Sequence, residues 1–152
     1  MTAKEYLDQI RRLDGLINSK LAILSTLEAS ATSTSAVTEV EPVSHTRNVH
    51  ALQDTVVKIM ELREEINSDT DALVDLREEV QRVIHRVDDA RCQTVLILRY
   101  VWLKPWKDIA AALSYSVRAV YKVRDRAIEK LDAVLLQSSI ESVQSCSLAD
   151  NS

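Results

Sequence analysis

Residues 94–131, TVLILRYVWLKPWKDIAAALSYSVRAVYKVRDRAIEKL, are the stretch from which the fold can be inferred. Apolar spacing predicts a short helix over 91–103, a second over 105–113, a turn at 114–115 and a third helix after Ser116. The first break falls at Lys104-Pro105, because the residue before a proline is biased away from the helical region and proline suits a first helical turn. This order and spacing are typical of a helix-turn-helix.

The second helix and the turn carry the details that such a unit needs. One apolar face is formed by Trp106, Ile109, Ala110 and Leu113. A small side chain such as Ala110 lets two helices cross closely. Tyr115 is expected to fill the space between the helices, and Ser116 to cap the third one. Ser114 stands where a left-handed backbone is wanted, and glycine would adopt that conformation at about 1 kcal/mol less cost.

The outer helices of the unit are predicted to be amphipathic. On the first, Val95, Leu98 and Trp102 form one stripe, with Leu96, Tyr100 and Leu103 beside it. On the third, the predicted core side is formed by Val120, Val123, Ala127 and Leu131, and the opposite face by Arg118, Lys122, Asp125 and Glu129. The basic part of that face lies in the first turns of the helix.

We call five residues at the start of the third helix the reading head: Ser116, Val117, Arg118, Tyr121 and Lys122. In a DNA major groove, arginine can bind guanine with two hydrogen bonds, lysine a guanine or a phosphate, and valine a thymine methyl group. Three further cations, Arg126, Lys107 and Lys104, are better placed for phosphates. Arg124 lies nearer the core and is assigned to packing or an internal ion pair. The alternative is that Arg118 and Lys122 belong to an ordinary solvated helix face.

Composition supports an all-α chain and an uneven distribution of charge. One glycine and two prolines in 152 residues leave few tight turns. The net charge is −4, yet residues 91–132 hold nine Lys or Arg against four Asp or Glu, net +5. The remaining residues hold ten against nineteen, net −9. Such asymmetry favours a polyanionic partner for the basic part.

Two longer helices are predicted upstream, over 3–28 and 49–88, joined by a flexible linker at 29–48. In the second, heptad spacing is unbroken through Leu52, Ile59, Ile66, Leu73, Val80 and Val87. The first helix has one break in its apolar stripe, at Lys20. We predict that it folds back antiparallel on the second, as a coiled-coil-like hairpin. Asp69 falls in a seam position, either as a polar residue that sets the register or, as we favour, turned outward.

Other classes of function find little support in the sequence. The two cysteines lie far apart, the acidic helix lacks paired metal-ligand spacing, and no nucleophile motif or glycine-rich phosphate loop is present. We therefore expect no enzyme, no catalytic residue, no cofactor and no metal. No signal peptide or membrane span is predicted, so a cytoplasmic location is expected. Residues 138–152 are predicted to be a disordered tail.

The stretch from Leu98 to Leu131 resembles region 4 of bacterial sigma factors. The resemblance rests on Leu98-Arg99-Tyr100, Asp108-Ile109-Ala110, Leu113-Ser114-Tyr115-Ser116 and Ala127-Ile128 to Leu131. Ser114 in place of glycine and Asp108 in place of glutamate depart from the family pattern. The whole chain is similar to small sigma-region-4-like proteins from prophages of Gram-positive bacteria, which are themselves similar to phage regulators of the ArpU and RinA kind. Neither a promoter −10 reading region nor a polymerase clamp is visible, so a complete sigma factor is not expected.

The resemblance implies a transcription regulator that binds double-stranded DNA, with RNA polymerase as a further partner. The predicted organisation is a helical hairpin at 1–89, a helix-turn-helix domain at 90–137 and the tail at 138–152. A homo-oligomer, with a dimer favoured, is expected through the hairpin. Two alternatives stay open: a protein-interaction module that never holds DNA, and a small-terminase-like DNA-packaging protein.

Overall fold

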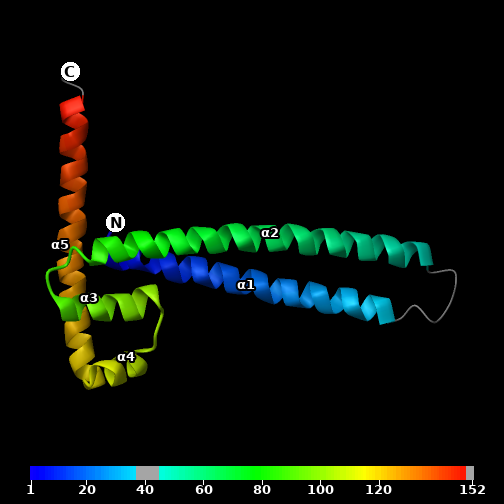
Figure 1. Cartoon of the computed structure of the whole chain (residues 1–152), viewed down its shortest axis with the longest axis horizontal. Helices are drawn as coiled ribbons and strands as arrows, with labels where there is room; N and C mark the ends of the chain where they lie inside the picture. The colour runs from blue at the N-terminus through cyan, green and yellow to red at the C-terminus, as the bar shows by residue number, and fades with distance from the viewer. Residues whose placement is uncertain (37–44, 150–152) are drawn as a thin grey trace. The chain divides into compact units, whose positions relative to one another are not determined.

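The chain is all-α, as the sequence predicts. The computed structural model describes residues 1–36 and 45–149, and this part of the chain contains helices and no strand. The helices are α1 (Ala3–Ala36), α2 (His45–Ile84), α3 (Ala90–Leu96), the π-helix η1 (Ile97–Val101), α4 (Trp106–Leu113) and α5 (Val117–Ala149) (Figure 1). None of the described helices is both long and apolar enough to cross a membrane.

The helices form two compact units. Unit 1 comprises Met1–Arg12 and Asp75–Ser152, and unit 2 comprises Leu13–Val74. The chain therefore does not divide at the predicted boundary of 89 and 90. The first turns of α1 belong to unit 1 because Leu7 and Ile10 are buried there, and because the backbone amide of Ala3 donates to the Asp132 carboxylate at 2.7 Å.

Several helix ends differ from their predicted places, among them the start of α2 at His45 rather than 49 and the end of η1 at Val101 rather than 103. Helix α1 continues to Ala36, α2 ends at Ile84, and α5 continues to Ala149, so residues 138–149 are helical where a disordered tail was predicted. Serine and threonine misled the prediction, since their hydroxyls donate to carbonyls one turn back, as Thr32 does to Glu28 and Ser139 to Leu135. The rest of the predicted linker, 37–44, and residues 150–152 lie outside the described residues.

Within unit 2, α1 and α2 form the predicted antiparallel pair. The Lys20 ammonium lies 2.6 Å from Asp69, and the Arg63 guanidinium lies 2.6 Å from Glu28, so residue numbers rise along one helix as they fall along the other. The expectation that Asp69 turns outward was wrong. Its carboxylate is only 23% exposed and meets Lys20, the one break in the apolar stripe of α1. Two polar exceptions in opposite seams therefore pair, which fixes the register of the hairpin.

Loss of either partner of the Lys20–Asp69 pair should lower the melting temperature of the chain. The Asp69→Ala variant leaves the Lys20 ammonium, which is 21% exposed, with only the more exposed Glu65 carboxylate at 3.4 Å, so the loss should exceed that of Glu28→Ala, which removes a solvent-exposed pair. In Lys20→Ala with Asp69→Ala the two losses should not add. Thermal melts of the four variants test this, and equal losses for Asp69→Ala and Glu28→Ala would contradict a role in setting the register.

The same pair should make unit 2 sensitive to alkaline pH. The hydrogen bond with Asp69 raises the pKa of Lys20 against the opposing effect of its burial, with Glu65 adding to the rise. A raised pKa in the folded state means that the stabilisation is complete below the unfolded-state pKa and is lost as the pH rises through the folded-state pKa. Melts at increasing alkaline pH should therefore show a steeper loss for the wild type than for Lys20→Ala with Asp69→Ala.

In unit 1, α3 and α4 both pack against the first half of α5 (Figure 1). The buried centre of this helix-turn-helix is formed by Val95, Ile109, Ala110 and Val120, with Leu98, Trp106, Leu113, Tyr115 and Val123 packed around it. The predicted core positions of the second and third helices are confirmed, including the small Ala110 at the crossing and Tyr115 between the helices. The Asp89 carboxylate caps α3 by accepting from the amides of Arg91 and Cys92.

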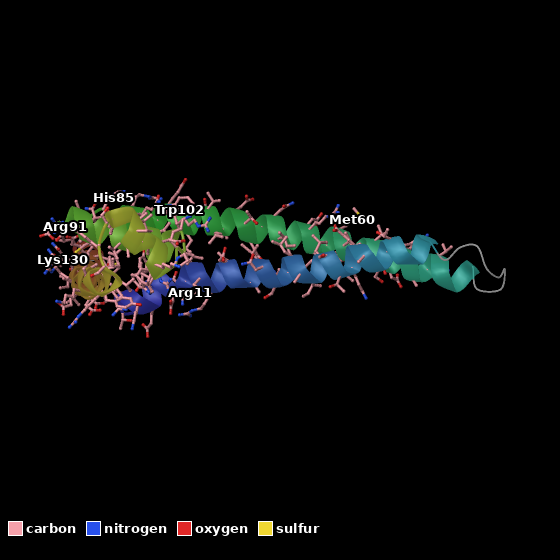
Figure 2. The ribbon with its side chains drawn as sticks, turned by 90° about the horizontal axis from the view of Figure 1, so that it is seen from below. Arg11, Met60, His85, Arg91, Trp102 and Lys130 are labelled. Carbon is pink, nitrogen blue, oxygen red and sulfur yellow. The ribbon has the colours of Figure 1, made fainter. Side chains whose placement is uncertain are left out.

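In the first helix of the helix-turn-helix, some residues lie on a different face from the one predicted. Residues Ile97–Val101 form a π-helix, and each π turn holds one more residue than an α-helical pattern allows. Positions after it are rotated, so Val101 is buried while Trp102 is 52% exposed. The Trp102 side chain is labelled in Figure 2. The prediction that Trp102 shares a core stripe with Val95 was therefore wrong. Its ring is covered instead by the Arg77 guanidinium, 5.3 Å from the ring centre.

The turn between α4 and α5 has the conformation that the sequence predicts. Ser114 adopts the left-handed region, with φ 56° and ψ 38°, and the Tyr115 amide donates to the Ala110 carbonyl at 3.0 Å. The Ser116 hydroxyl then accepts from the Ala119 amide at 3.1 Å, which confirms it as the cap of α5. A non-glycine residue thus holds a strained position in the turn that sets the angle between the two helices.

Replacing Ser114 with glycine should stabilise unit 1. Glycine tolerates a positive φ without a Cβ clash, so Ser114→Gly should raise the free energy of unfolding by about 0.5–1 kcal/mol, in spite of the larger entropy of its unfolded chain. Ser114→Ala keeps the Cβ and should give no gain. Urea unfolding of the two variants and the wild type measures the difference. A destabilised Ser114→Gly chain would count against strain at this turn.

Candidate nucleic-acid interface

The start of α5 presents the predicted reading head to solvent. Val120 is fully buried on the inner side of this helix, while Arg118 and Lys122 are exposed on the outer side. Ser116 is exposed at the cap, and Val117 and Tyr121 are 39% and 38% exposed. Five side chains of different chemistry therefore share one accessible surface within two helical turns.

The cations assigned to this surface have no ion-pair partner among the described residues, so their charges are available to an anionic partner. Within residues 1–36 and 45–149, no ion pair involves Arg118, Lys122, Arg126, Lys107 or Lys104, and all five are exposed. Lys107 lies in the first turn of α4, and Lys104 lies just before that helix. Arg126 lies about one turn beyond Lys122 on α5. The five residues of the reading head thus lie together at the start of α5. The cations predicted to contact phosphates lie on α4, just before α4 and further along α5.

Tyr121 belongs to this surface and also to the packing beneath it. Its ring meets the Trp106 ring edge to face, with centroids 5.4 Å apart. The Arg124 guanidinium lies 4.9 Å from the centre of the Tyr121 ring and 5.5 Å from that of Trp106. Arg124 also pairs with Asp125 at 2.8 Å, which confirms its assignment to packing and an internal ion pair. These contacts hold the Tyr121 ring in one orientation beside Lys122.

The N-terminus of α4 adds a second feature that favours anions. Pro105 precedes the helix in an extended conformation and gives it no side-chain cap. The amides of Asp108 and Ile109 are the first to bond within this turn, both to the Pro105 carbonyl at 3.1 Å. The preceding amides of Trp106 and Lys107 lie at the positive end of the helix dipole. A phosphate oxygen at this end would also lie near the Lys107 side chain.

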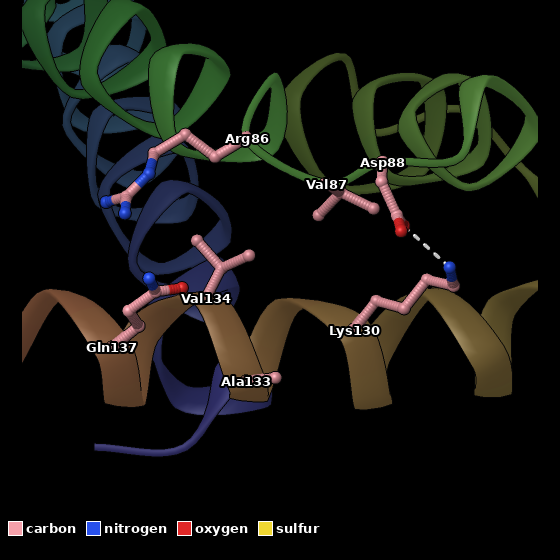
Figure 3. A pocket seen from close by; sticks show the side chains of 7 residues that line it. All are labelled: Arg86, Val87, Asp88, Lys130, Ala133, Val134 and Gln137. Carbon is pink, nitrogen blue, oxygen red and sulfur yellow. Dashed lines mark hydrogen bonds and ion pairs between the residues drawn. The ribbon is translucent and has the colours of Figure 1, made fainter.

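A separate hollow in unit 1 has a different character. It encloses about 260 Å³ between Arg86, Val87 and Asp88 on one side and Lys130, Ala133, Val134 and Gln137 of α5 on the other (Figure 3). Its central charges neutralise each other, since Lys130 donates to Asp88 at 2.6 Å. This hydrogen bond lowers the pKa of the Asp88 carboxyl and raises that of Lys130. We interpret the pair as a clasp between the α2–α3 connection and α5.

The buried Cys92 is a poor nucleophile. Cys92 is fully buried, and burial, reinforced by Asp89, raises the pKa of its thiol, so the nucleophilic thiolate is disfavoured. No three His, Cys, Asp or Glu side chains converge as metal ligands within the described part of the chain. The exposed basic surface around α5 is therefore the most specific candidate site.

The chain matches the model of a protein family. The profile of the family described as "Protein of unknown function (DUF1492)" matches residues 33–132, which is most of the chain. The chain belongs to the DUF1492 family. No curated protein and no solved structure matches it. The matched region of this DUF1492 chain runs from the end of α1 to Asp132 on α5, and so includes the whole reading head.

One group of residues near the interface was not predicted from the sequence. Arg99 of η1 lies over Trp106, with its guanidinium 4.7 Å from the ring centre. Lys4 and Arg11 of α1 line the same region of unit 1. Arg99 stands close to Tyr100 and Trp106 in the sequence, and this was a usable signal for the first contact. The approach of α1 had no local signal, because it depends on a contact between distant parts of the chain.

Proposed function

We propose that this DUF1492 protein is a sequence-specific, DNA-binding transcription regulator of the phage or prophage type, which lays the first turns of α5 in the DNA major groove. The observation that carries the proposal is the exposed, unpaired Arg118 and Lys122 on the outer face of a helix whose inner face is buried in a helix-turn-helix. In this role Arg118 binds guanine, Lys122 binds guanine or phosphate, and Val117 contacts a thymine methyl group.

Backbone contacts complete the proposed complex. Lys104, Lys107 and Arg126 are exposed, and in the proposed complex they bind phosphates. The amides at the start of α4 favour a further phosphate through the helix dipole. The chain as a whole carries −4, so non-specific affinity is weak and depends strongly on salt. Useful affinity for DNA therefore requires a further contribution from a binding partner.

In the proposal, two partners supply this further contribution to DNA affinity. Unit 2 exposes large apolar side chains on both of its helices, among them Leu16 and Ile23 on α1 and Val57 and Met60 on α2. An apolar surface of this kind favours association with a second copy of the hairpin. A two-fold dimer then presents two reading heads to two half-sites. The resemblance to sigma region 4 favours RNA polymerase as a further partner.

Enrichment of binding sites from a random duplex pool tests the proposal. The full chain should select a recurrent sequence, with guanine at the position that Arg118 reads, and a dimer should select two copies at a fixed spacing. The Arg118→Ala chain should lose that guanine preference while it still binds the flanking phosphates. A pool that stays random after repeated rounds would contradict sequence-specific recognition.

A second candidate function is a protein-interaction module that never holds DNA. The exposed apolar side chains of unit 2 favour it, because they can bind another protein as readily as a second copy of the chain. The two candidates differ in one measurable property. Association through these apolar side chains should weaken little with rising salt, whereas binding to DNA should weaken steeply.

A further inference from the structure

Unit 1 contains a basic cleft that the sequence did not predict. It is formed by the first turns of α1 with Lys4, Asp8 and Arg11, by Arg99 and the buried Tyr100 of η1, by Trp106 of α4 and by Arg124 of α5. It encloses about 240 Å³. Four different helical elements therefore converge on one hollow, and each contributes at least one charged or aromatic side chain.

The charges in this cleft do not balance. Four cations line it against one carboxylate, that of Asp8. Arg124 is paired outside the lining, with Asp125 at 2.8 Å. Lys4 and Arg11 form no ion pair with any described residue, although Asp8 lies on the same helix. Like charges gathered around one hollow repel one another, so an anion between them is stabilised.

The Trp106 ring holds two of the four cations of the cleft, Arg99 and Arg124. The Trp106 ring lies beneath the guanidinium groups of Arg99, at 4.7 Å, and Arg124, at 5.5 Å. Arg99 also donates to the Lys104 carbonyl at 3.0 Å, which limits the rotation of its planar group. The Trp106 ring surface that a nucleobase needs for stacking is thus occupied, whereas the outer nitrogen atoms of the cations remain suited to oxyanions.

We propose that this cleft binds a phosphate group, held by Lys4, Arg11, Arg99 and Arg124. Guanidinium groups bind phosphate oxygens through paired, charge-assisted hydrogen bonds, and a tetrahedral oxyanion with a few waters fits the volume of the cleft. Two sources share this chemistry. One is a backbone phosphate of DNA, reached because Trp106 and Arg124 contact Tyr121 of the reading head. The other is a free phosphate or phosphate ester. Only the first source rests on the proposed function.

Tryptophan fluorescence provides a direct readout of the cleft. In the full chain carrying Trp102→Phe, Trp106 is the single tryptophan, and it lies in the cleft wall. Titration with inorganic phosphate should change its emission in a saturable way, and sodium chloride at equal ionic strength should not. Arg11→Ala or Lys4→Ala should weaken phosphate binding about tenfold. Arg12→Ala, which removes the same charge from the next exposed position outside the cleft, should leave it unchanged.

The source of the phosphate follows from the DNA affinity of the same variants. If the cleft holds a DNA phosphate, Arg11→Ala weakens duplex binding and reduces the salt slope by about one, whereas Arg12→Ala does not. If it holds a free phosphate, Arg11→Ala weakens phosphate binding and leaves duplex binding as it was.

Two results would overturn the proposal: equal emission changes with phosphate and chloride, or equal titrations for Arg11→Ala and Arg12→Ala. Loss of DNA binding in Arg118→Ala with an intact phosphate titration would separate the cleft from the reading head. The phosphate titration uses no DNA. The cleft can therefore bind phosphate even if the chain does not bind DNA, and the chain can bind DNA even if the cleft does not bind phosphate.

Discussion

Replacing both Arg118 and Lys122 with alanine is expected to weaken sequence-specific DNA binding by on the order of a hundredfold or more, because each base contact of this kind is worth about 1–3 kcal/mol. Both side chains are exposed and unpaired among the described residues, so their removal leaves the core of unit 1 untouched. Fluorescence anisotropy with the duplex enriched by the wild-type chain measures the loss, and unchanged thermal melts show that the fold persists.

A charge-matched control separates recognition from general attraction. Arg12→Ala with Lys58→Ala removes the same net charge from exposed positions outside the reading head. This control should lower the affinity only slightly, because screening limits the effect of distant surface charges. Equal losses in the two double variants would mean that Arg118 and Lys122 act only through net charge. The ordinary solvated helix face would then describe α5 better than a reading head.

The second large effect is expected at Ala110, where α4 packs against the buried centre of the helix-turn-helix. This side chain is 5% exposed and lies with Val95, Ile109 and Val120. Leucine there adds three carbon atoms to a packed site, so Ala110→Leu should cost about 1–3 kcal/mol and lower Tm by roughly 5–15 °C. The angle between α4 and α5 should change as well, because the helices must separate. DNA affinity should therefore fall even at temperatures where the variant is folded.

The neighbouring alanine provides the control for this substitution. Ala111 lies next to Ala110 on the same helix but is exposed. Leucine and alanine differ little in helix propensity, so Ala111→Leu should change neither Tm nor DNA affinity appreciably. Circular dichroism melts and anisotropy on both variants test the pair. If Ala110→Leu were as stable as Ala111→Leu, close packing at this crossing would be refuted.

Local chemistry predicted most of the helix-turn-helix. Tyr115 and Ser116 took the roles that their side chains favour, and Ser114 took the left-handed conformation that the turn requires although its Cβ disfavours it, because a turn and a cap depend on a few adjacent residues. The inner face of α5 was equally predictable from helical spacing, since Val120 and Leu131 can be buried on only one side. The exposure of the reading head follows from the same periodicity. Its DNA contacts remain a prediction.

The differences arise where the structure depends on distant residues or departs from α-helical spacing. Trp102 lies outside the predicted core because η1 is a π-helix. A pattern based on 3.6 residues per turn cannot predict an extra residue in a turn. Asp69 was assigned to solvent because its neighbours Thr70 and Asp71 are polar. Its partner Lys20 lies 49 positions away, and only the hairpin brings the two together.

The basic cleft is a further case of this kind. Lys4 and Arg11 look like ordinary surface charges of an amphipathic helix. They gain a role only because α1 begins in the same compact unit as the helix-turn-helix, where the Ala3 amide bonds to Asp132. A contact across most of the chain cannot be predicted from the composition or periodicity of either segment.

The most direct test of the account is the salt dependence of binding by the full wild-type chain to its enriched duplex. With Lys104, Lys107 and Arg126 on phosphates, the logarithm of affinity should fall linearly with the logarithm of salt concentration, with a slope of about −3 or steeper. Arg118→Ala with Lys122→Ala should lower that affinity by on the order of a hundredfold at every salt concentration. Binding that ignores salt, or that survives this double substitution, would contradict the account.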